Sequence, residues 1–486
     1  MSKAVKDGME AQSFSVKRAE VEFHSFASFG EPERAMGKYS EENLRRGGLL
    51  HGHASFYGRM TPFLEIGANV GHTSYMLVNE FGEQGIALDI SADALRNGHL
   101  VMERWGLEQQ PVRIAGDALH LPFKDNSLRM VLAFQMLSQF QDIEAVFIEA
   151  KRVLQPGGIF MFGEEPIRRL LSLRLRRAPY WEQMNSWERK LHEWGLLGFL
   201  TKDVIGAEQE ESFGIRQNHR TKLWDWINMI DRHFVERECT VFVPKRGWGE
   251  RAAYRLLKLA DRNQSEWLPA RFLGGTLTAF CRKEGQAPET DAGDATLHQT
   301  FERILQCPDC GGPVERRDDA ALACQSCEYS APSEEGVYNL LGSEDRRELY
   351  PGLRSDVIDF SADDCEDRLI DGFQPIEGIP GNKYRWINER ASFTLVPVRP
   401  GQRRLRIRGF CGPAFLSQPT PPKIGISANG AAVSTHTVDR PGLFIIETAL
   451  PEAASYEIAI QAGPSHQSPP DERWFTVNLS LMRLID

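Results

Sequence analysis

The chain has 486 residues, of which 41% are hydrophobic and 26% charged, and its formal net charge is −10 at pH 7. This length predicts two to four domains, and the composition is ordinary for a soluble globular protein. The acidic balance disfavours a nucleic-acid substrate, because phosphate binders usually carry a basic face. No apolar stretch has the length of a membrane-spanning helix, and the first residues lack the apolar core of a signal peptide. We therefore expect a cytoplasmic protein.

Residues 1–49 precede the first predicted strand and carry several aromatic side chains, among them Phe23, Phe26 and Tyr39. So many aromatic residues are unusual in a free tail. We expect irregular structure and a helix that packs over the mouth of a ligand site.

Residues 61–71, Thr-Pro-Phe-Leu-Glu-Ile-Gly-Ala-Asn-Val-Gly, predict an apolar strand that breaks into a glycine turn. The residues after the turn have helix-like spacing, and the next apolar run ends in Asp89. Such a turn lets a nucleotide-like ligand lie against bare backbone, and an acid roughly 20 residues later can accept two hydrogen bonds from a ribose diol. The ordinary alternative is a βαβ turn in which Asp89 caps the following helix.

The turn does not match the G-x-G-x-x-G cradle of a dinucleotide site. It resembles motif I of the class I S-adenosylmethionine (SAM) methyltransferases, with Asn69 at the place of the middle glycine. Four later segments resemble the same family in its order: Gly116–Phe123, Asn126–Phe134, Glu149–Gly158 and Phe272–Lys283.

The resemblance covers about residues 50–285. It implies an α/β Rossmann-like fold whose parallel sheet has an antiparallel last strand. It also implies that Asp89 binds the ribose of SAM and Asp117 the adenine amino group. The cofactor-binding residues that it implies are Glu65, Gly67, Ala68, Asn69, Gly71, Asp89, Ile90, Asp117, Ala118 and Gln135.

Residues 164–232 interrupt the alternation of strands and helices and are rich in tryptophan. Ligands of open α/β sheets bind beyond the carboxyl ends of the strands, so we expect a helical lid and acceptor pocket here. A secondary core is the alternative. Within this stretch, Ile167–Arg177 is basic and leucine-rich, which suits an anionic lipid head group or a lipid-linked acceptor. An ordinary solvated helix face would have the same pattern.

Two residues are candidate general bases for an acceptor that must lose a proton. His219 lies in the insertion, and histidine titrates near neutral pH. Glu164 follows the fifth predicted strand. A surface or core histidine is an equally good interpretation of His219.

Cys307, Cys310, Cys324 and Cys327 form a C-x2-C-x13-C-x2-C pattern. Two such turns supply four thiolates in a tetrahedron, which predicts a structural zinc site. Two disulfides or four free thiols are the alternatives. Residues 300–342, after a polar linker at 286–299, resemble the small zinc-ribbon proteins of the Trm-one-twelve type. This resemblance implies a support for the methyltransferase in cis or a platform for its substrate.

Residues 343–367 read as a charged connector, and 368–486 as short alternating runs broken by Pro and Gly. Period-two alternation predicts an antiparallel β-sandwich. This sandwich resembles modules attached to bacterial glycan-processing transferases, which are similar to carbohydrate-binding jelly rolls.

Together these features predict a multidomain SAM-dependent methyltransferase with a structural zinc ion, acting on a glycan, a lipid-linked glycan or another small molecule. The alternatives are an RNA or protein methyltransferase that uses the ribbon as a substrate platform, or a non-catalytic SAM-binding scaffold. The sequence does not indicate an oligomeric state.

Overall fold

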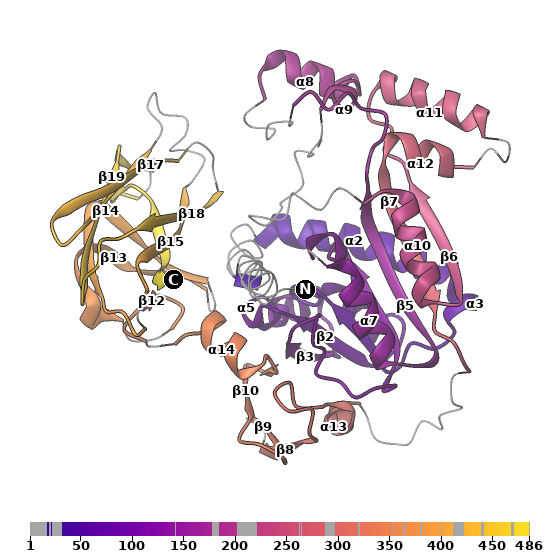
Figure 1. The fold of residues 1–486 in the computed structure, drawn as a ribbon, viewed down its shortest axis with the longest axis horizontal. Helices are drawn as coiled ribbons and strands as arrows, with labels where there is room; N and C mark the ends of the chain where they lie inside the picture. Colours follow the sequence, from indigo (N-terminus) through magenta and orange to yellow (C-terminus); the bar gives the residue numbers. More distant parts are fainter. Residues whose placement is uncertain are drawn as a thin grey trace. The chain divides into compact units, whose positions relative to one another are not determined.

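The computed structural model forms two compact units, Met1–Asp345 and Arg346–Asp486 (Figure 1). The predicted base His219 lies outside the residues that the structure describes. The described residues are 17–18, 21, 32–140, 142–176, 184–201, 221–261, 263, 265–286, 297–318, 321–352, 354–362, 365–379, 382–399, 401–411, 422–438, 442–467 and 471–485.

The first unit is built on one mixed sheet with the strand order β6-β7-β5-β4-β1-β2-β3, which continues into β11-β10-β9-β8. Strands β3, β2, β1, β4 and β5 pair in parallel, whereas β7 runs antiparallel to both β5 and β6. The expected Rossmann-like sheet with an antiparallel last strand is therefore confirmed. The strands are β1 (Phe63–Ile66), β2 (Gly85–Asp89), β3 (Val112–Ala115), β4 (Leu128–Phe134), β5 (Leu154–Ile167), β6 (Glu236–Phe242) and β7 (Gly275–Arg282).

Helices cover both faces of the sheet, because alternate residues of its buried strands point to opposite sides. Phe63 and Met130 pack in one apolar cluster with Leu50 and Met76. Leu64 and Val131 pack in the other, with the helix residues Phe147 and Trp226. The helices are α2 (Pro32–Gly52), α3 (Ala54–Tyr57), α4 (His72–Asn79), α5 (Ala92–Arg96), α6 (Gly98–Trp105), α7 (Ile143–Val153) and α10 (Leu223–His233).

The cysteine-rich segment extends this sheet. Its strands are β8 (Val314–Asp318), β9 (Ala321–Cys324), β10 (Ser330–Glu334) and β11 (Val337–Asn339), and β11 pairs in parallel with β3. Leu340 N donates to Ala115 O at 2.8 Å, and Arg113 Nη2 donates to Glu335 O at 2.7 Å. Phe301, Leu305 and Leu322 belong to the same apolar cluster as the central strands. The segment therefore shares a core with the sheet that it was expected only to accompany.

The described parts of the stretch expected as a lid, 164–176, 184–201 and 221–232, divide between two places. Helix α10 packs against the sheet, where Trp226 is fully buried and its Nε1 donates to Pro166 O at 3.2 Å. Helices α8 (Ser186–Glu193) and α9 (Leu197–Leu200) belong to a lobe beyond the sheet. They are joined there by two helices from the β6–β7 connection, α11 (Trp248–Ala260) and α12 (Trp267–Leu273), which the sequence analysis did not assign to the insertion.

The described strands of the second unit all pair antiparallel, as expected, and enclose one apolar cluster. The end of helix α14 (Ser343–Leu349) and the short helix η4 (Glu366–Arg368) also belong to this unit. Its strand β12 pairs with β22 and so takes in part of the stretch expected to be a connector. The strands are β12 (Val357–Asp359), β13 (Leu369–Ile379), β14 (Asn382–Leu395), β15 (Arg404–Cys411), β16 (Lys423–Ala428), β17 (Ala431–Thr437), β18 (Gly442–Ala449), β19 (Tyr456–Gly463), β20 (His466–Gln467), β21 (Trp474–Phe475) and β22 (Asn478–Ile485).

Candidate cofactor and metal sites

The turn between β1 and α4 has the backbone conformation that the glycine pattern predicts. Gly67 and Gly71 adopt φ values of 68° and 83°, and Asn69 adopts 53°. Asparagine is one of the few residue types with a side chain that enters this left-handed region at small cost. Asn69 can therefore replace a glycine here. A Cβ atom on Gly67 would lie 3.0 Å from the Met136 side chain. The close approach of Met136 therefore also favours glycine at this position.

Asp89 fastens the end of β2 to this turn. Its Oδ2 accepts a hydrogen bond from Asn69 N at 2.7 Å, and its Oδ1 accepts one from Ser91 N at 2.8 Å. Ser91, and not Asp89, caps α5, because the Ser91 hydroxyl accepts from Ala94 N. A carboxylate offers about four acceptor sites, so this anchoring is compatible with a ribose diol at the same group.

Glu65 and Ala68, also expected at the cofactor, are buried beside the turn. The Glu65 carboxylate accepts from the Ser74 hydroxyl at 2.5 Å, which ties β1 to α4, and burial raises the pKa of Glu65. Ala68 N donates to Leu88 O at 3.0 Å. Both residues therefore stabilise the turn through contacts with the neighbouring strand and helix. Ile90 follows Asp89 and is half-buried.

Asp117 lies in the loop after β3, with Ala118 buried next to it. Its Oδ1 accepts from Leu119 N at 2.9 Å, and its Oδ2 lies 2.9 Å from both His120 Nδ1 and Lys17 Nζ. Burial alone would raise the pKa of Asp117, but His120 and Lys17 outweigh it and lower that pKa. The carboxylate expected to meet the adenine amino group thus contacts a lysine from the N-terminal segment.

Gln135, directly after β4, meets Glu164, which lies inside β5 at an irregularity between Phe162 and Glu165 and does not follow the strand as expected. Gln135 Nε2 donates to Glu164 Oε2 at 2.7 Å, and both residues have positive φ, 54° and 64°. Side-chain-bearing residues with such backbone angles cluster at functional sites, where the surrounding structure maintains the strain. This edge of the sheet, next to Gly67, is where the family resemblance expects the reacting groups.

The Glu164 carboxylate is paired with two arginines of α2. Arg46 Nη2 lies 3.1 Å from Glu164 Oε2, and Arg45 pairs with Oε1. Burial would raise the pKa of Glu164, but Arg46 and Arg45 outweigh it and lower that pKa. A carboxylate held ionised in this way is a weak base, so the geometry favours a positioning role for Glu164.

Helix α2 contributes a buried polar cluster that the sequence analysis did not predict. Arg46 is 4% exposed, donates to Thr73 Oγ1 at 2.7 Å and lies over the Phe134 ring. Glu42 Oε2 lies 2.9 Å from His72 Nε2 and 3.5 Å from Arg46 Nη2. The four-residue spacing of Glu42 and Arg46 was the available signal, because such pairs share one helix face.

The Glu42 cluster should make the docking of α2 depend on pH. Burial would raise the pKa of Glu42, but His72 and Arg46 outweigh it and lower that pKa from 4.5 to about 2. A lowered acid pKa stabilises the fold above the unfolded pKa, and the effect is lost as pH falls through the folded pKa. We expect Glu42→Gln to lower the free energy of unfolding at neutral pH by about 3 kcal/mol.

Urea unfolding at several pH values measures this effect. The difference between Glu42→Gln and the parent chain should narrow as pH falls from 4.5 toward 2, the interval between the two pKa values of Glu42. Glu41→Gln, an exposed change on the same helix, is the matched control and should have little effect. A difference that stays constant over this pH range would contradict the assignment.

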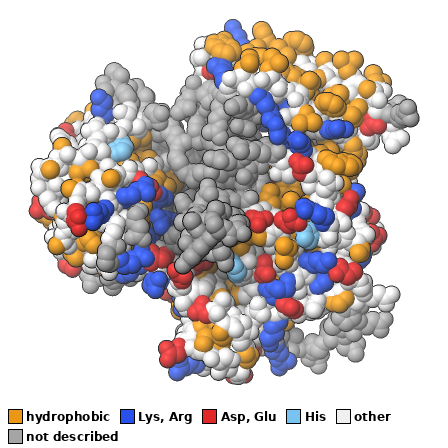
Figure 2. All heavy atoms as spheres, in the orientation of Figure 1, with side chains coloured by type: hydrophobic (Ala, Val, Ile, Leu, Met, Phe, Trp, Pro, Cys, Tyr) orange, Lys and Arg blue, Asp and Glu red, His pale blue; other side chains and the backbone are white. Residues whose placement is uncertain are grey.

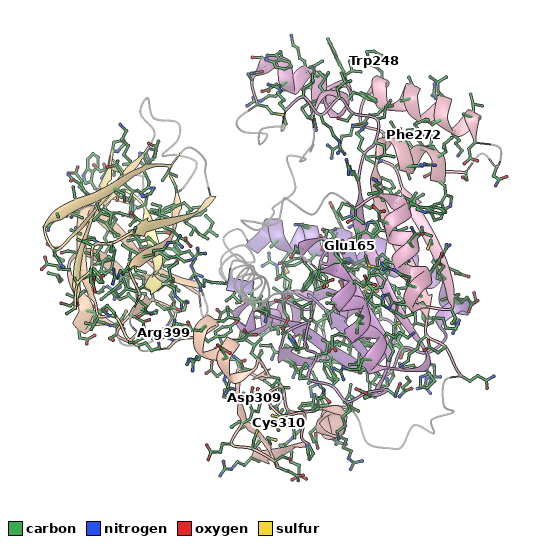
Figure 3. All side chains as sticks on the ribbon, in the orientation of Figure 1. Glu165, Trp248, Phe272, Asp309, Cys310 and Arg399 are labelled. Carbon is green, nitrogen blue, oxygen red and sulfur yellow. The ribbon has the colours of Figure 1, made fainter. Side chains whose placement is uncertain are left out.

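Glu165, the neighbour of Glu164, is fully buried and shapes the same edge (Figure 3). Its carboxylate accepts from the backbone N–H groups of Met136, Leu137 and Ser138 at 2.8–2.9 Å. Burial raises the pKa of Glu165 to about 7, although these donors act to lower it. Glu165 therefore fixes the loop that begins at Gln135 and contains the short helix η1 (Leu137–Gln139).

The four cysteines of the ribbon converge on one point, and their Sγ atoms all lie within 4.8 Å of one another. The Sγ atoms of Cys307 and Cys327 lie 3.7 Å apart, and those of Cys310 and Cys324 lie 3.5 Å apart. These distances exclude disulfides in this structure. Four sulfurs each about 2.3 Å from a zinc ion at tetrahedral angles lie about 3.8 Å apart, so the spacing fits a zinc ion.

The backbone around the cysteines supports the same assignment. Gly312 N donates to Cys310 Sγ at 3.4 Å, and Ser326 N donates to Cys324 Sγ at 3.3 Å. Such donors stabilise thiolates, which are the form that binds metal. A Cβ on Gly312 would lie 2.6 Å from Ser326 Oγ, so the knuckle requires glycine at that position.

Comparison with known proteins finds similarity in one part of the chain. Residues 64–162 match the family model described as "Methyltransferase domain". Sterol 24-C-methyltransferase ERG6B of Gibberella zeae is 32% identical over 97 residues, which are 20% of this chain and 26% of that protein. Norajmaline N-methyltransferase of Rauvolfia serpentina is 32% identical over 94 residues, 19% of this chain and 32% of that protein.

The chain thus spans about a quarter to a third of the length of these curated relatives. Among solved structures, geranyl diphosphate C-methyltransferase of Streptomyces coelicolor A3(2) aligns with a TM-score of 0.31 and 12% identity. That alignment covers 53% of this chain and 84% of the other. Residues 64–162 therefore resemble a methyltransferase domain in sequence, and the strand order and the turn at Gly67 are compatible with that match.

Proposed function

We propose that this chain is a SAM-dependent methyltransferase. The observation that carries the proposal is the turn from Gly67 to Gly71, with positive φ at both glycines and the Asp89 carboxylate bonded to its middle residue. Such a turn can receive a nucleoside against bare backbone, and an acid at the end of the next strand can accept hydrogen bonds from its ribose. The match of residues 64–162 to the methyltransferase domain model supports the same activity.

Each residue at the site has a definite role in this proposal. Gly67, Asn69 and Asp89 hold the nucleoside, and Asp117 receives the adenine amino group. SAM supplies a methyl group that its sulfonium has already activated. The protein's share is then to position an acceptor atom in line with that methyl, and positioning alone supplies much of the rate. Arg45 and Arg46 pair with Glu164, and Gln135 donates a hydrogen bond to it. Gln135 and Glu164 would then shape the edge of the sheet where the acceptor binds.

We propose a glycan, a lipid-linked glycan or another small molecule as the acceptor. The net charge of −10 supports this choice over a nucleic acid, and the resemblance of the β unit to glycan-associated modules favours a sugar. Some relatives are named for a sterol or an alkaloid acceptor, which are small molecules as well. His219 remains our proposed base for a hydroxyl or amine acceptor.

We also propose that Cys307, Cys310, Cys324 and Cys327 hold one structural zinc ion. Four thiolates close the coordination sphere and leave no position for a reacting water. The ion would stabilise the ribbon strands that extend the sheet past β3, and it takes no part in methyl transfer.

Two measurements test the proposed activity. Calorimetry with S-adenosylhomocysteine should give saturable one-to-one binding, and an absence of binding would refute the cofactor site. Incubation with SAM carrying a labelled methyl group and fractionated cell extract should move label into carbohydrate, lipid or another small molecule. Label in RNA or protein would refute the proposed acceptor, and binding without any transfer would favour a scaffold.

A further inference from the structure

The lobe beyond the sheet exposes leucines along an extended segment. Leu171, Leu173 and Leu175 are 43%, 69% and 73% exposed. The polar residues between them turn inward: Ser172 Oγ donates to Thr201 O at 2.7 Å, and Arg174 Nη2 donates to Arg169 O at 2.8 Å. Backbone bonds from Leu173 N to Phe199 O and from Leu175 N to Leu200 O hold this orientation. In this segment the apolar side chains therefore point outward and the polar ones inward. A strand that faces water has the opposite arrangement.

Helix α11 adds a second exposed apolar stripe to the lobe. Trp248, Leu256 and Leu259 are 62%, 69% and 76% exposed and recur at helical spacing, whereas Tyr254 on the opposite face is buried. Gly249 N donates to Trp194 O at 2.9 Å, which joins α11 to the end of α8. Single exposed apolar residues are normal on any protein, but several together on one lobe mark an interaction surface.

Basic side chains surround these apolar residues. In the described parts of the lobe, residues 168–176, 184–201, 245–261 and 265–273, eight Lys and Arg side chains are exposed against one acid, Glu193. Arg251 and Arg255 lie on α11 itself. Figure 2 shows hydrophobic side chains gathered over this lobe with Lys and Arg beside them. The whole chain has a net charge of −10, so this local excess of positive charge favours an anionic binding partner for the lobe.

We propose that this lobe binds the surface of an anionic phospholipid bilayer through Leu171–Leu175 and helices α8 and α11. Leucine and tryptophan side chains enter the interface between head groups and acyl chains, and the arginines meet lipid phosphates. Charge complementarity selects this partner over a second copy of the chain, because two such basic faces would repel each other. Figure 3 shows that Trp248 and Phe272 lie in this lobe, away from Glu165 at the sheet.

The inference deepens the proposed function, since a methyltransferase held at a bilayer would reach an acceptor that is a lipid or is linked to one. It does not depend on methyl transfer. Vesicle binding can be measured without SAM, and therefore a failure here differs from a failure of the cofactor site.

Co-sedimentation of the full chain with phospholipid vesicles tests the proposal. With vesicles of phosphatidylcholine and about 30% phosphatidylglycerol, we expect binding at least about tenfold tighter than with phosphatidylcholine alone, and weaker binding at high salt. Trp248→Glu and the double change Leu173→Glu with Leu175→Glu should each reduce binding by about tenfold or more. Arg251→Glu with Arg255→Glu should remove the preference for the anionic lipid.

Trp474→Glu is the matched control, because Trp474 is 59% exposed, close to the 62% of Trp248, and lies in the second unit. It should bind vesicles like the parent chain. Thermal melting of every variant establishes that it is folded. Equal binding by Trp248→Glu and Trp474→Glu, or no binding by the folded parent chain, would overturn the proposal. A dimer in ultracentrifugation that Leu173→Glu dissociates would do the same, since it would assign the surface to a second copy.

Discussion

A Cys310→Ser variant is expected to lose its zinc ion and to melt at a temperature lower by roughly 10 °C or more than the parent chain. Removing one thiolate opens a closed four-sulfur site, and structural zinc contributes directly to folding free energy. The damage should not stay within the ribbon. Strand β11 pairs with β3, and Leu305 and Leu322 pack in the same apolar cluster as the central strands.

Elemental analysis, calorimetric melting and hydrogen exchange together check this result. The amide of Leu340, which donates to Ala115 O across the junction, should exchange faster in the variant. Cys239→Ser is the control, because this half-buried thiol lies on β6 and is not one of the four clustered cysteines. It should keep zinc and melt within a few degrees of the parent. A zinc-free Cys310→Ser chain with unchanged melting would contradict a structural role for the metal.

The attachment of the ribbon to the sheet could not be predicted from its residues. The cysteine spacing predicts the metal cluster, because each Cys-x-x-Cys turn is a local structure. The pairing of β11 with β3 is a long-range match between two strand edges, and the residues Val337–Asn339 carry no signal that names their partner. A module of about 40 residues is too small to bury a sufficient core of its own. The ribbon avoids that difficulty by joining the core of the larger sheet.

The same division between local and long-range information appears at the cofactor site. The turn at Gly67 and the acid at Asp89 follow from a few consecutive residues, and the structure has both where the sequence predicts them. Arg46 and Glu42 were missed, since their contacts depend on how α2 crosses α4. Trp224 and Trp226 are two residues apart on α10, so they face different ways, and only Trp226 enters the core.

An Asp89→Asn variant is expected to bind S-adenosylhomocysteine about 100-fold more weakly than the parent chain. An ionised carboxylate makes hydrogen bonds worth roughly 1.5–3 kcal/mol each, and a ribose diol would donate two. The amide oxygen of asparagine can still accept from Asn69 N, so most of the anchoring of the turn should survive. Melting without ligand should therefore change far less than affinity does.

Titration calorimetry on the variant and on Asp93→Asn provides the comparison. Asp93 lies on α5, four residues away, and its carboxylate pairs with Arg96, so the control removes the same charge from the same region. Asp93→Asn should bind S-adenosylhomocysteine as the parent chain does. If Asp89→Asn and Asp93→Asn both bind S-adenosylhomocysteine as tightly as the parent chain does, Asp89 only shapes the turn between β1 and α4. If only Asp89→Asn loses affinity while its melting stays close to that of the parent, the carboxylate at the end of β2 holds the nucleoside directly. That outcome requires the ligand to lie along Gly67–Gly71, because Asp89 is bonded to the middle of that turn.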